Sequence, residues 1–128
     1  MEKTVRETIK EIIKKHLKGN KGQAYGQCLT AVGWVGGTIP ELYEKDGMIE
    51  LPMSDVSNGG IVVGAGLMNK RPIYIIRYQG FNWYNCPIII NYACKSKELW
   101  KIPCPIFIRG IGMEGGIGPV AGSSHHSL

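Results

Sequence analysis

The stretch MIELPMSDVSNGGIVVGAGLMNKRPIYIIRY, residues 48–78, decides the fold class. MIEL predicts a short strand, DVSNGGIVVGAGLMNK a glycine-laden helix, and PIYIIRY a strong strand. The run PIYII is uniformly apolar, as expected of a strand that is buried on both faces of a sheet. Strands that alternate with helices favour an α/β domain with a largely parallel sheet and helices on both faces.

The rest of the chain continues this alternation. Thr4 and Glu7 form a capping-box signature, and apolar residues at helical spacing predict a helix from about residue 4 to 17. A second short helix is expected from about Pro40 to Gly47. The other predicted elements are a strand at 23–29, a loop at 30–37, a helix at 82–100, a strand at 104–109 and a glycine-rich loop at 112–128.

Length and composition restrict the class of protein. A chain of 128 residues has room for one domain. Its composition, with 44% apolar and 20% charged residues, is typical of a soluble globular protein. No apolar run approaches the ~20 residues of a membrane span, and the charged N-terminus does not resemble a secretory signal. We therefore expect a cytoplasmic protein without a membrane partner.

The cysteines and charges indicate no special chemistry. The four cysteines form no CxxC pair and the three histidines complete no ligand spacing with them, so we expect free buried thiols and no metal site. The net charge of +5 raises nucleic acid as a partner. Because the basic residues of the first helix are interleaved with Glu2, Glu7 and Glu11, a solvated face is favoured over nucleic-acid binding.

One glycine motif is discounted. Gly110, Gly112 and Gly115 satisfy G-x-G-x-x-G after a predicted strand, which suggests a dinucleotide-binding turn. The glycines and proline that follow argue against the helix that such a turn requires, and no acidic residue lies ~20 positions further on. A flexible active-site loop is the preferred interpretation.

A more specific set of motifs occurs in order along the chain. PMSD at 52–55, NKRP at 69–72 and YQGF at 78–81 match the PISE, G-x-RP and F-x-GF stretches of a known family. From about Gly26 onward the chain resembles the pyrimidine-binding domain of thiamine diphosphate enzymes of the transketolase type. It is most similar to beta subunits of pyruvate dehydrogenase-type 2-oxo acid dehydrogenase components. The resemblance implies that residues 1–128 are an incomplete pyrimidine-binding domain without the C-terminal transketolase domain.

The resemblance also implies roles for individual residues. Asp55 stands where the family glutamate binds a ring nitrogen of the aminopyrimidine, whose imino form then deprotonates the thiazolium carbon. Tyr78, Phe81 and Tyr84 match the aromatic pyrimidine pocket, and flat rings pack well on such side chains. His125 matches a histidine that contacts substrate and assists proton transfer.

The implied function needs a second chain. Thiamine diphosphate would be the cofactor, with its diphosphate and Mg²⁺ held by an alpha-type partner subunit, because this chain has no GDG-type motif. The assembly, a hetero-oligomer or homodimer, would decarboxylate a 2-oxo acid or transfer a ketol or acyl unit. One alternative is a non-catalytic structural or regulatory remnant, since Asp55 is shorter than glutamate by roughly 1.5 Å and Gln27 stands where beta subunits carry an acid. A basic nucleic-acid-binding module is the second alternative.

Each assigned residue also has a structural explanation. Asp55 follows a strand, where aspartate is a common helix N-cap. The i, i+3, i+6 spacing of Tyr78, Phe81 and Tyr84 is also that of a buried helix edge, and His125 lies in what could be a solvated tail.

Two structural expectations complete the interpretation. Ligands of open parallel sheets bind outside the carboxyl ends of the strands, so Asp55, Tyr78 and the loop from Gly110 should gather there. Large aromatic residues are enriched in interfaces, so the chain should expose apolar surface to a partner, with the tryptophans at 34, 83 and 100 as candidates.

Overall fold

A computed structural model describes residues 2–76 and 82–111. Its centre is a four-stranded sheet in the order β2-β1-β3-β4, in which every pairing is parallel. The strands are β1 (Gly22–Gly26), β2 (Met48–Glu50), β3 (Arg71–Ile76) and β4 (Phe107–Gly110). The α/β class and the largely parallel sheet are thereby confirmed, and each strand overlaps a predicted one.

The order of the strands reverses at β1. The chain passes from β1 to β2 on one side, and α3 (Asp55–Leu67) then carries it back across β1 to β3. In open α/β sheets such a reversal creates a crevice at the carboxyl ends of the strands, here those of β1 and β3. Gly26 ends β1 against β3, and a Cβ there would lie 2.6 Å from the Ile75 carbonyl oxygen. Only glycine permits this approach.

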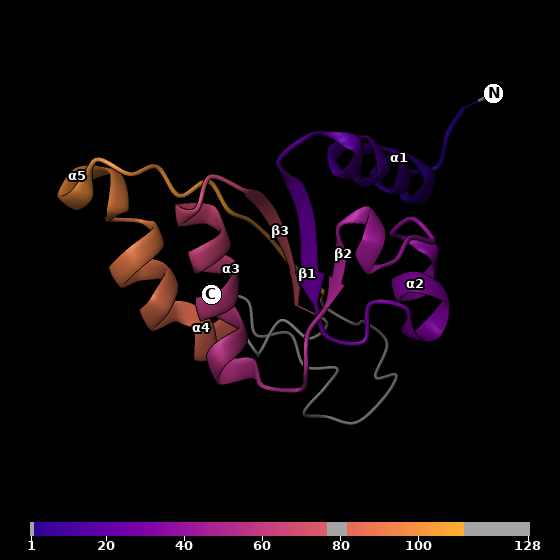
Figure 1. Cartoon of the computed structure of the whole chain (residues 1–128). Helices are drawn as coiled ribbons and strands as arrows, with labels where there is room; N and C mark the ends of the chain where they lie inside the picture. The colour runs from indigo at the N-terminus through magenta and orange to yellow at the C-terminus, as the bar shows by residue number, and fades with distance from the viewer. Residues whose placement is uncertain (1, 77–81, 112–128) are drawn as a thin grey trace.

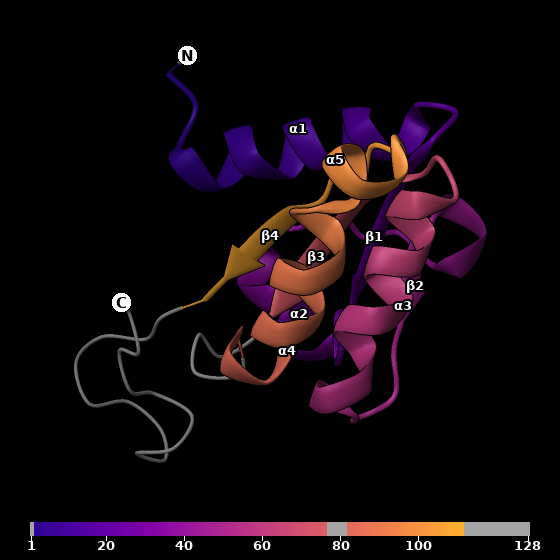
Figure 2. The same ribbon diagram turned by 90° about the vertical axis from the view of Figure 1, so that its left-hand side faces the viewer.

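Helices cover both faces of the sheet (Figure 1). On one face α1 (Val5–Lys18) packs Ile13 and Leu17 against alternate residues of β1 and β3. On the other face Tyr25 and Tyr74 pack against Val62 of α3. Figure 2 shows α3 and α4 in front of the strands and α1 running along the top of the view. The uniformly apolar sequence of β3 therefore reflects burial on both faces.

Helix α1 begins as its sequence predicts. The Glu7 backbone N–H donates to the Thr4 hydroxyl at 3.2 Å, and the Thr4 backbone N–H donates to the Glu7 carboxylate at 2.8 Å. These two bonds form the predicted capping box. Near the other end, Nε2 of His16 lies 2.7 Å from the Arg71 carbonyl oxygen and joins α1 to the start of β3.

Residues 30–37 differ from the predicted loop. They form α2 (Ala31–Gly37), whose second half has five consecutive positive φ angles, including those of Trp34 and Val35. Left-handed backbone is costly for residues with a Cβ, but the three glycines of this segment adopt it readily. Trp34 is also anchored, because its indole N–H donates to the Leu42 carbonyl oxygen at 3.2 Å.

The predicted helix from Pro40 to Gly47 was wrong. Only one 3-10 turn forms there, η1 (Glu44–Asp46), and it ends at Gly47 with φ of 87°. Proline favours the first turn of a helix but does not itself create one, and eight residues are too few to form a stable helix without packing.

The predicted helix at 82–100 is confirmed as helical but is interrupted. It comprises α4 (Asn82–Ile88), a π turn η3 (Ile89–Ala93) and α5 (Ser96–Trp100). Pro87 lies inside α4, and in the π turn the Cys94 N–H donates to the Ile89 carbonyl oxygen at 2.9 Å. A proline removes one helical hydrogen bond, and widened turns are a common adjustment.

The four cysteines are free, as predicted, but none is fully buried. Cys94 is exposed, while Cys28, Cys86 and Cys104 are partly buried. Burial raises the pKa of the Cys104 thiol, which donates to the Val63 carbonyl oxygen at 3.5 Å. A raised pKa disfavours the reactive thiolate at this position.

Candidate functional site at the carboxyl edge of the sheet

The parallel strands bring four chain segments to one edge of the sheet. β1, β2, β3 and β4 end there at Gly26, Glu50, Ile76 and Gly110. Asp55 begins α3 shortly after the end of β2, so its backbone belongs to this edge. β3 and β4 therefore end at the same edge as the start of α3.

The structure describes only part of the predicted site. Asp55 and Tyr84 lie in α3 and α4, where the backbone is described, and Tyr78, Phe81 and His125 lie outside the described residues. Their gathering into one site therefore stays a prediction. The N-cap of α3 is Ser54, so the alternative in which Asp55 occupies the N-cap position was wrong. Asp55 is instead the first residue of the helix.

The loop after β1 is held to the end of β2 by a carboxylate that the sequence analysis missed. Glu50 accepts hydrogen bonds from the backbone N–H groups of Leu29 at 2.8 Å and Thr30 at 3.4 Å. Leu29 is fully buried, so one end of the loop that carries Gln27 is fixed in place. An acidic residue inside an otherwise apolar strand was the available signal.

Two buried asparagines, also missed, fix the start of α3. Asn58 Nδ2 donates to the Pro52 carbonyl oxygen at 2.9 Å, which closes the turn leading into the helix. Asn85 of α4 accepts from the Gly59 backbone N–H at 2.9 Å and lies 3.5 Å from the Tyr74 hydroxyl. The first turn of α3 is thus tied to its preceding loop, to α4 and to β3.

Close packing explains two of the glycines of α3 but not the other two. A Cβ on Gly59 would clash with Asn85 Oδ1, and one on Gly66 would lie 2.7 Å from Cys104 Sγ. At these two positions close packing is the reason for glycine. A Cβ on Gly60 would have a nearest neighbour 4.0 Å away, and one on Gly64 would meet nothing within 4 Å. Close packing therefore does not explain Gly60 or Gly64.

This edge combines a buried acceptor, unpaired within the described part of the chain, with exposed apolar surface. Oδ1 of Asn58 is buried and has no hydrogen-bond partner among the described residues, so an acceptor is left over in the first turn of α3. Met53, two residues before Asp55, is 82% exposed and offers apolar surface.

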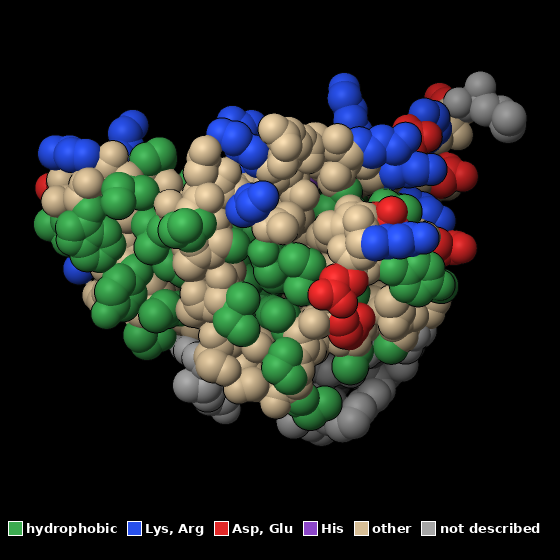
Figure 3. Space-filling view, in the orientation of Figure 1, with side chains coloured by type: hydrophobic (Ala, Val, Ile, Leu, Met, Phe, Trp, Pro, Cys, Tyr) green, Lys and Arg blue, Asp and Glu red, His purple; other side chains and the backbone are tan. Residues whose placement is uncertain are grey.

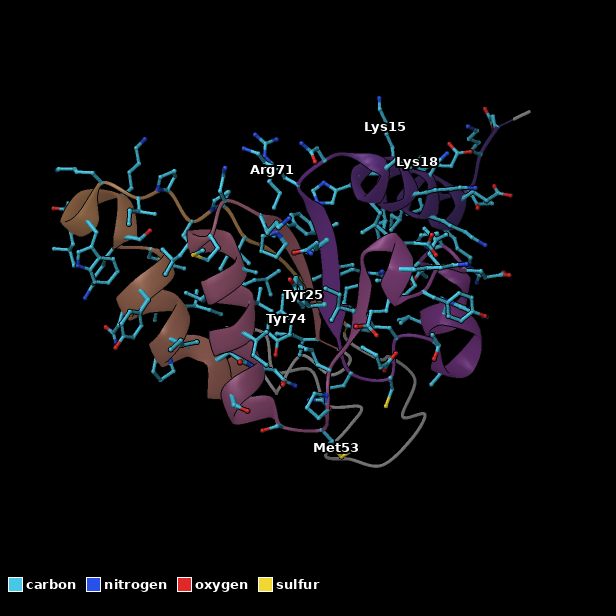
Figure 4. The ribbon with its side chains drawn as sticks, in the orientation of Figure 1. Lys15, Lys18, Tyr25, Met53, Arg71 and Tyr74 are labelled. Carbon is cyan, nitrogen blue, oxygen red and sulfur yellow. The ribbon has the colours of Figure 1, made fainter. Side chains whose placement is uncertain are left out.

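The same edge is less suited to a diphosphate. Lys15, Lys18 and Arg71 lie at the opposite end of the sheet from Met53 (Figure 4). Arg71 begins β3, so this basic group belongs to the amino ends of the strands. Charges placed there cannot neutralise phosphates at the carboxyl ends, because salt screens exposed charges within about 10 Å.

Comparison with protein-family models and with curated proteins finds no match. Among residues 2–76 and 82–111 no three histidine, cysteine or acidic side chains are grouped so as to hold a metal ion. In the same part of the chain no helix has the length and apolarity needed to cross a membrane.

Proposed function

We propose that this chain is the pyrimidine-binding part of a thiamine diphosphate-dependent enzyme. The enzyme decarboxylates a 2-oxo acid or transfers a ketol or acyl unit, and it is active with a partner subunit that holds the diphosphate and Mg²⁺. The observation that carries the proposal is the position of Asp55 at the start of α3, on the edge where β3 and β4 also end. The ordered motifs PMSD, NKRP and YQGF support it.

Asp55 accepts a hydrogen bond from the pyrimidine ring in this proposal. The backbone near its position is held by the contacts of Asn58 with Pro52 and of Asn85 with Gly59. When bound, the cofactor supplies an acidic carbon that adds to the substrate carbonyl. The protein's own part would be to hold a proton on the ring through Asp55.

The partner subunit would dock on an apolar face. Exposed apolar side chains gather over α4 and α5 in Figure 3. Those of this region and the adjoining part of α3 are Ile61, Ile90, Tyr92, Leu99, Trp100 and Ile102. Trp100 stacks on Tyr92 with ring centroids 6.0 Å apart, an aromatic pair of the kind that anchors interfaces. Trp34 is less suitable as an anchor because it is partly buried against Tyr43.

The test is the exchange rate of the cofactor's thiazolium proton, measured by NMR in the complex reconstituted with a diphosphate-binding subunit. We expect Asp55→Ala to slow this exchange by about 10²-fold or more. Asp55→Glu should restore it, because glutamate reaches roughly 1.5 Å further. Ser57→Ala, an exposed change in the same helical turn, is the matched control. An unchanged exchange rate in Asp55→Ala would contradict the proposal.

The non-catalytic alternative has a distinct outcome. A remnant that keeps the fold without the chemistry would bind the partner but would show no thiazolium proton exchange above the rate of free cofactor. Asp55→Glu would then leave the exchange rate of the complex unchanged.

A further inference from the structure

β4 is an edge strand with unused hydrogen-bonding groups. Among the described residues it pairs with β3 alone. The Ile111 backbone N–H donates to the Ile76 carbonyl oxygen at 3.1 Å, on the β3 side. Backbone groups alternate along a strand, so the N–H groups of Ile108 and Gly110 point away from β3. Such an edge is a template for another strand.

A cavity of about 530 Å³ adjoins this edge on the α1 side of the sheet. Its walls are apolar side chains of α1, β3 and β4, among them Ile12, Ile73 and Phe107. Ile12 is 62% exposed and Phe107 63% exposed, although both are large and apolar. The groove between α1 and β4 is therefore open and apolar.

Arg109 supplies a positive charge to this groove. Its Nη2 donates to the Thr38 hydroxyl at 2.8 Å, while its Nη1 is buried and has no partner among the described residues. Burial lowers the pKa of the Arg109 guanidinium, yet arginine stays charged in proteins. A partly buried cation with an unused donor is costly, and a carboxylate would satisfy it.

The groove continues into a basic region. A second hollow of about 630 Å³ shares Ile12 and His16 with the first and is lined by three cations, Lys15, Lys21 and Arg71, without any carboxylate. Lys15 and Arg71 are labelled at this end of the molecule in Figure 4. An occupant of the whole groove would therefore meet apolar walls, the unused donor of Arg109 and a positively charged end.

We propose that the groove between α1 and β4 binds an extended segment of another polypeptide, apolar and acidic in sequence, which adds to β4 as a further strand. Main-chain hydrogen bonds to an edge strand supply affinity in this mode of binding, and alternate side chains supply specificity. A second copy of this chain is disfavoured, because it would bring Arg109 and the lysines of α1 against their own like charges. The proposal concerns the outer side of β4 and does not depend on the cofactor.

Selection from a random peptide library displayed on phage, with the full chain as bait, tests the proposal. We expect enrichment of sequences in which apolar residues alternate with aspartate or glutamate. A selected peptide, made with a fluorescent label, should bind about tenfold more weakly to Phe107→Lys, which removes an apolar wall and places a charge on the edge. Met68→Lys, an equally drastic change at an exposed methionine beyond α3, should bind as the wild type does.

The variant Arg109→Gln tests whether the charge of Arg109, rather than the integrity of the fold, contributes to peptide binding. It should weaken the acidic peptide about tenfold but leave unchanged an analogue whose acidic residues are replaced by their amides. Selected sequences without acidic residues, or equal binding to Phe107→Lys, would overturn the proposal. Self-association that Phe107→Lys abolishes would assign the edge to a second copy. Binding of single-stranded oligothymidylate with no enriched peptide would assign the groove to nucleic acid and equally overturn it.

Discussion

Gly59 shows how a single hydrogen atom in place of a side chain positions the candidate site. It lets the backbone of α3 approach Asn85 of α4 closely enough for the hydrogen bond of 2.9 Å between them. Any side chain at this position would meet Asn85 first. The start of α3, and with it Asp55, is therefore located by the absence of a Cβ.

Gly59→Ala should destabilise the protein by about 1–3 kcal/mol, because the added methyl group overpacks the contact with Asn85. Gly64→Ala, in the same helix with no atom within 4 Å of the new Cβ, should stabilise it by up to ~1 kcal/mol through helix propensity. Urea denaturation of both variants measures the two effects. Equal stabilisation by both would show that α3 and α4 do not approach closely at Gly59.

Glu50→Gln should loosen the loop after β1. The carboxylate accepts from the amides of Leu29 and Thr30, and a charged acceptor is stronger than a neutral one by roughly 1 kcal/mol. We expect hydrogen exchange of the Leu29 amide to accelerate several-fold in NMR measurements. Glu41→Gln, whose partner Lys10 lies on α1 3.6 Å away, should leave that amide unchanged.

Few of the individual residues that position the candidate site could be predicted from the sequence. Asp55 was placed correctly at the edge because a strand followed by a helix is a local pattern. Glu50, Asn58 and Asn85 were missed because their importance arises from partners 21, 6 and 26 residues away. Asn58 shows why: its neighbour in sequence is glycine, and nothing local indicates that it is fully buried.

Among the elements, α1 was the most predictable. Its capping box and its apolar face are both formed by residues that lie close together in the sequence. The helix could therefore be predicted without knowledge of its tertiary contacts. Residues 30–37 were the least predictable, because glycines indicate only conformational freedom. The left-handed turn there depends on the indole of Trp34 reaching the Leu42 carbonyl oxygen, which is a contact made by a later segment.

The capping box should make the stability of α1 depend on pH. The backbone N–H of Thr4, and then its hydroxyl, hold the pKa of Glu7 below its ordinary value of 4.5. A carboxyl with a lowered folded pKa stabilises the fold above its ordinary pKa, and this contribution is lost as the pH falls through the folded value. Glu7→Gln, which keeps an acceptor but does not titrate, should be less stable than wild type at about pH 7.

Thermal unfolding followed by circular dichroism measures this difference. The gap between wild type and Glu7→Gln should narrow as the pH falls from about 7 through the lowered folded pKa of Glu7 and should close below that pKa. Glu2→Gln, before the helix, is the control and should show no such closing gap. A gap that persists at the acidic pH would mean that charge on Glu7 does not support the cap.

For the whole molecule, the class was predictable and the strand order was not. Alternating strands and helices indicate a parallel sheet, but the order β2-β1-β3-β4 depends on which side of β1 each strand joins. The position of Lys15, Lys18 and Arg71 at the end of the sheet opposite Met53 follows from that same three-dimensional arrangement (Figure 4).

The apolar face over α4 and α5 should make the isolated chain associate at high protein concentration. Leu99→Lys should weaken that association, because it places a charge among exposed apolar side chains. Val5→Lys, an exposed apolar position at the start of α1, should not. Sedimentation velocity over a range of concentrations measures both, and a wild-type protein that stays monomeric throughout would argue against this face as an interface.

The central position of β1 has a consequence for how the protein is made. β1 leaves the ribosome early, yet its partners follow much later: Ala24 pairs with Met48 and Gly22 pairs with Arg71. At typical rates of synthesis the strand waits roughly 2–10 s for β3. During that interval the apolar side chains of β1 have no partner strand to pack with. A nascent-chain chaperone that shields residues 22–26 until β3 has emerged would therefore raise the yield of folded protein.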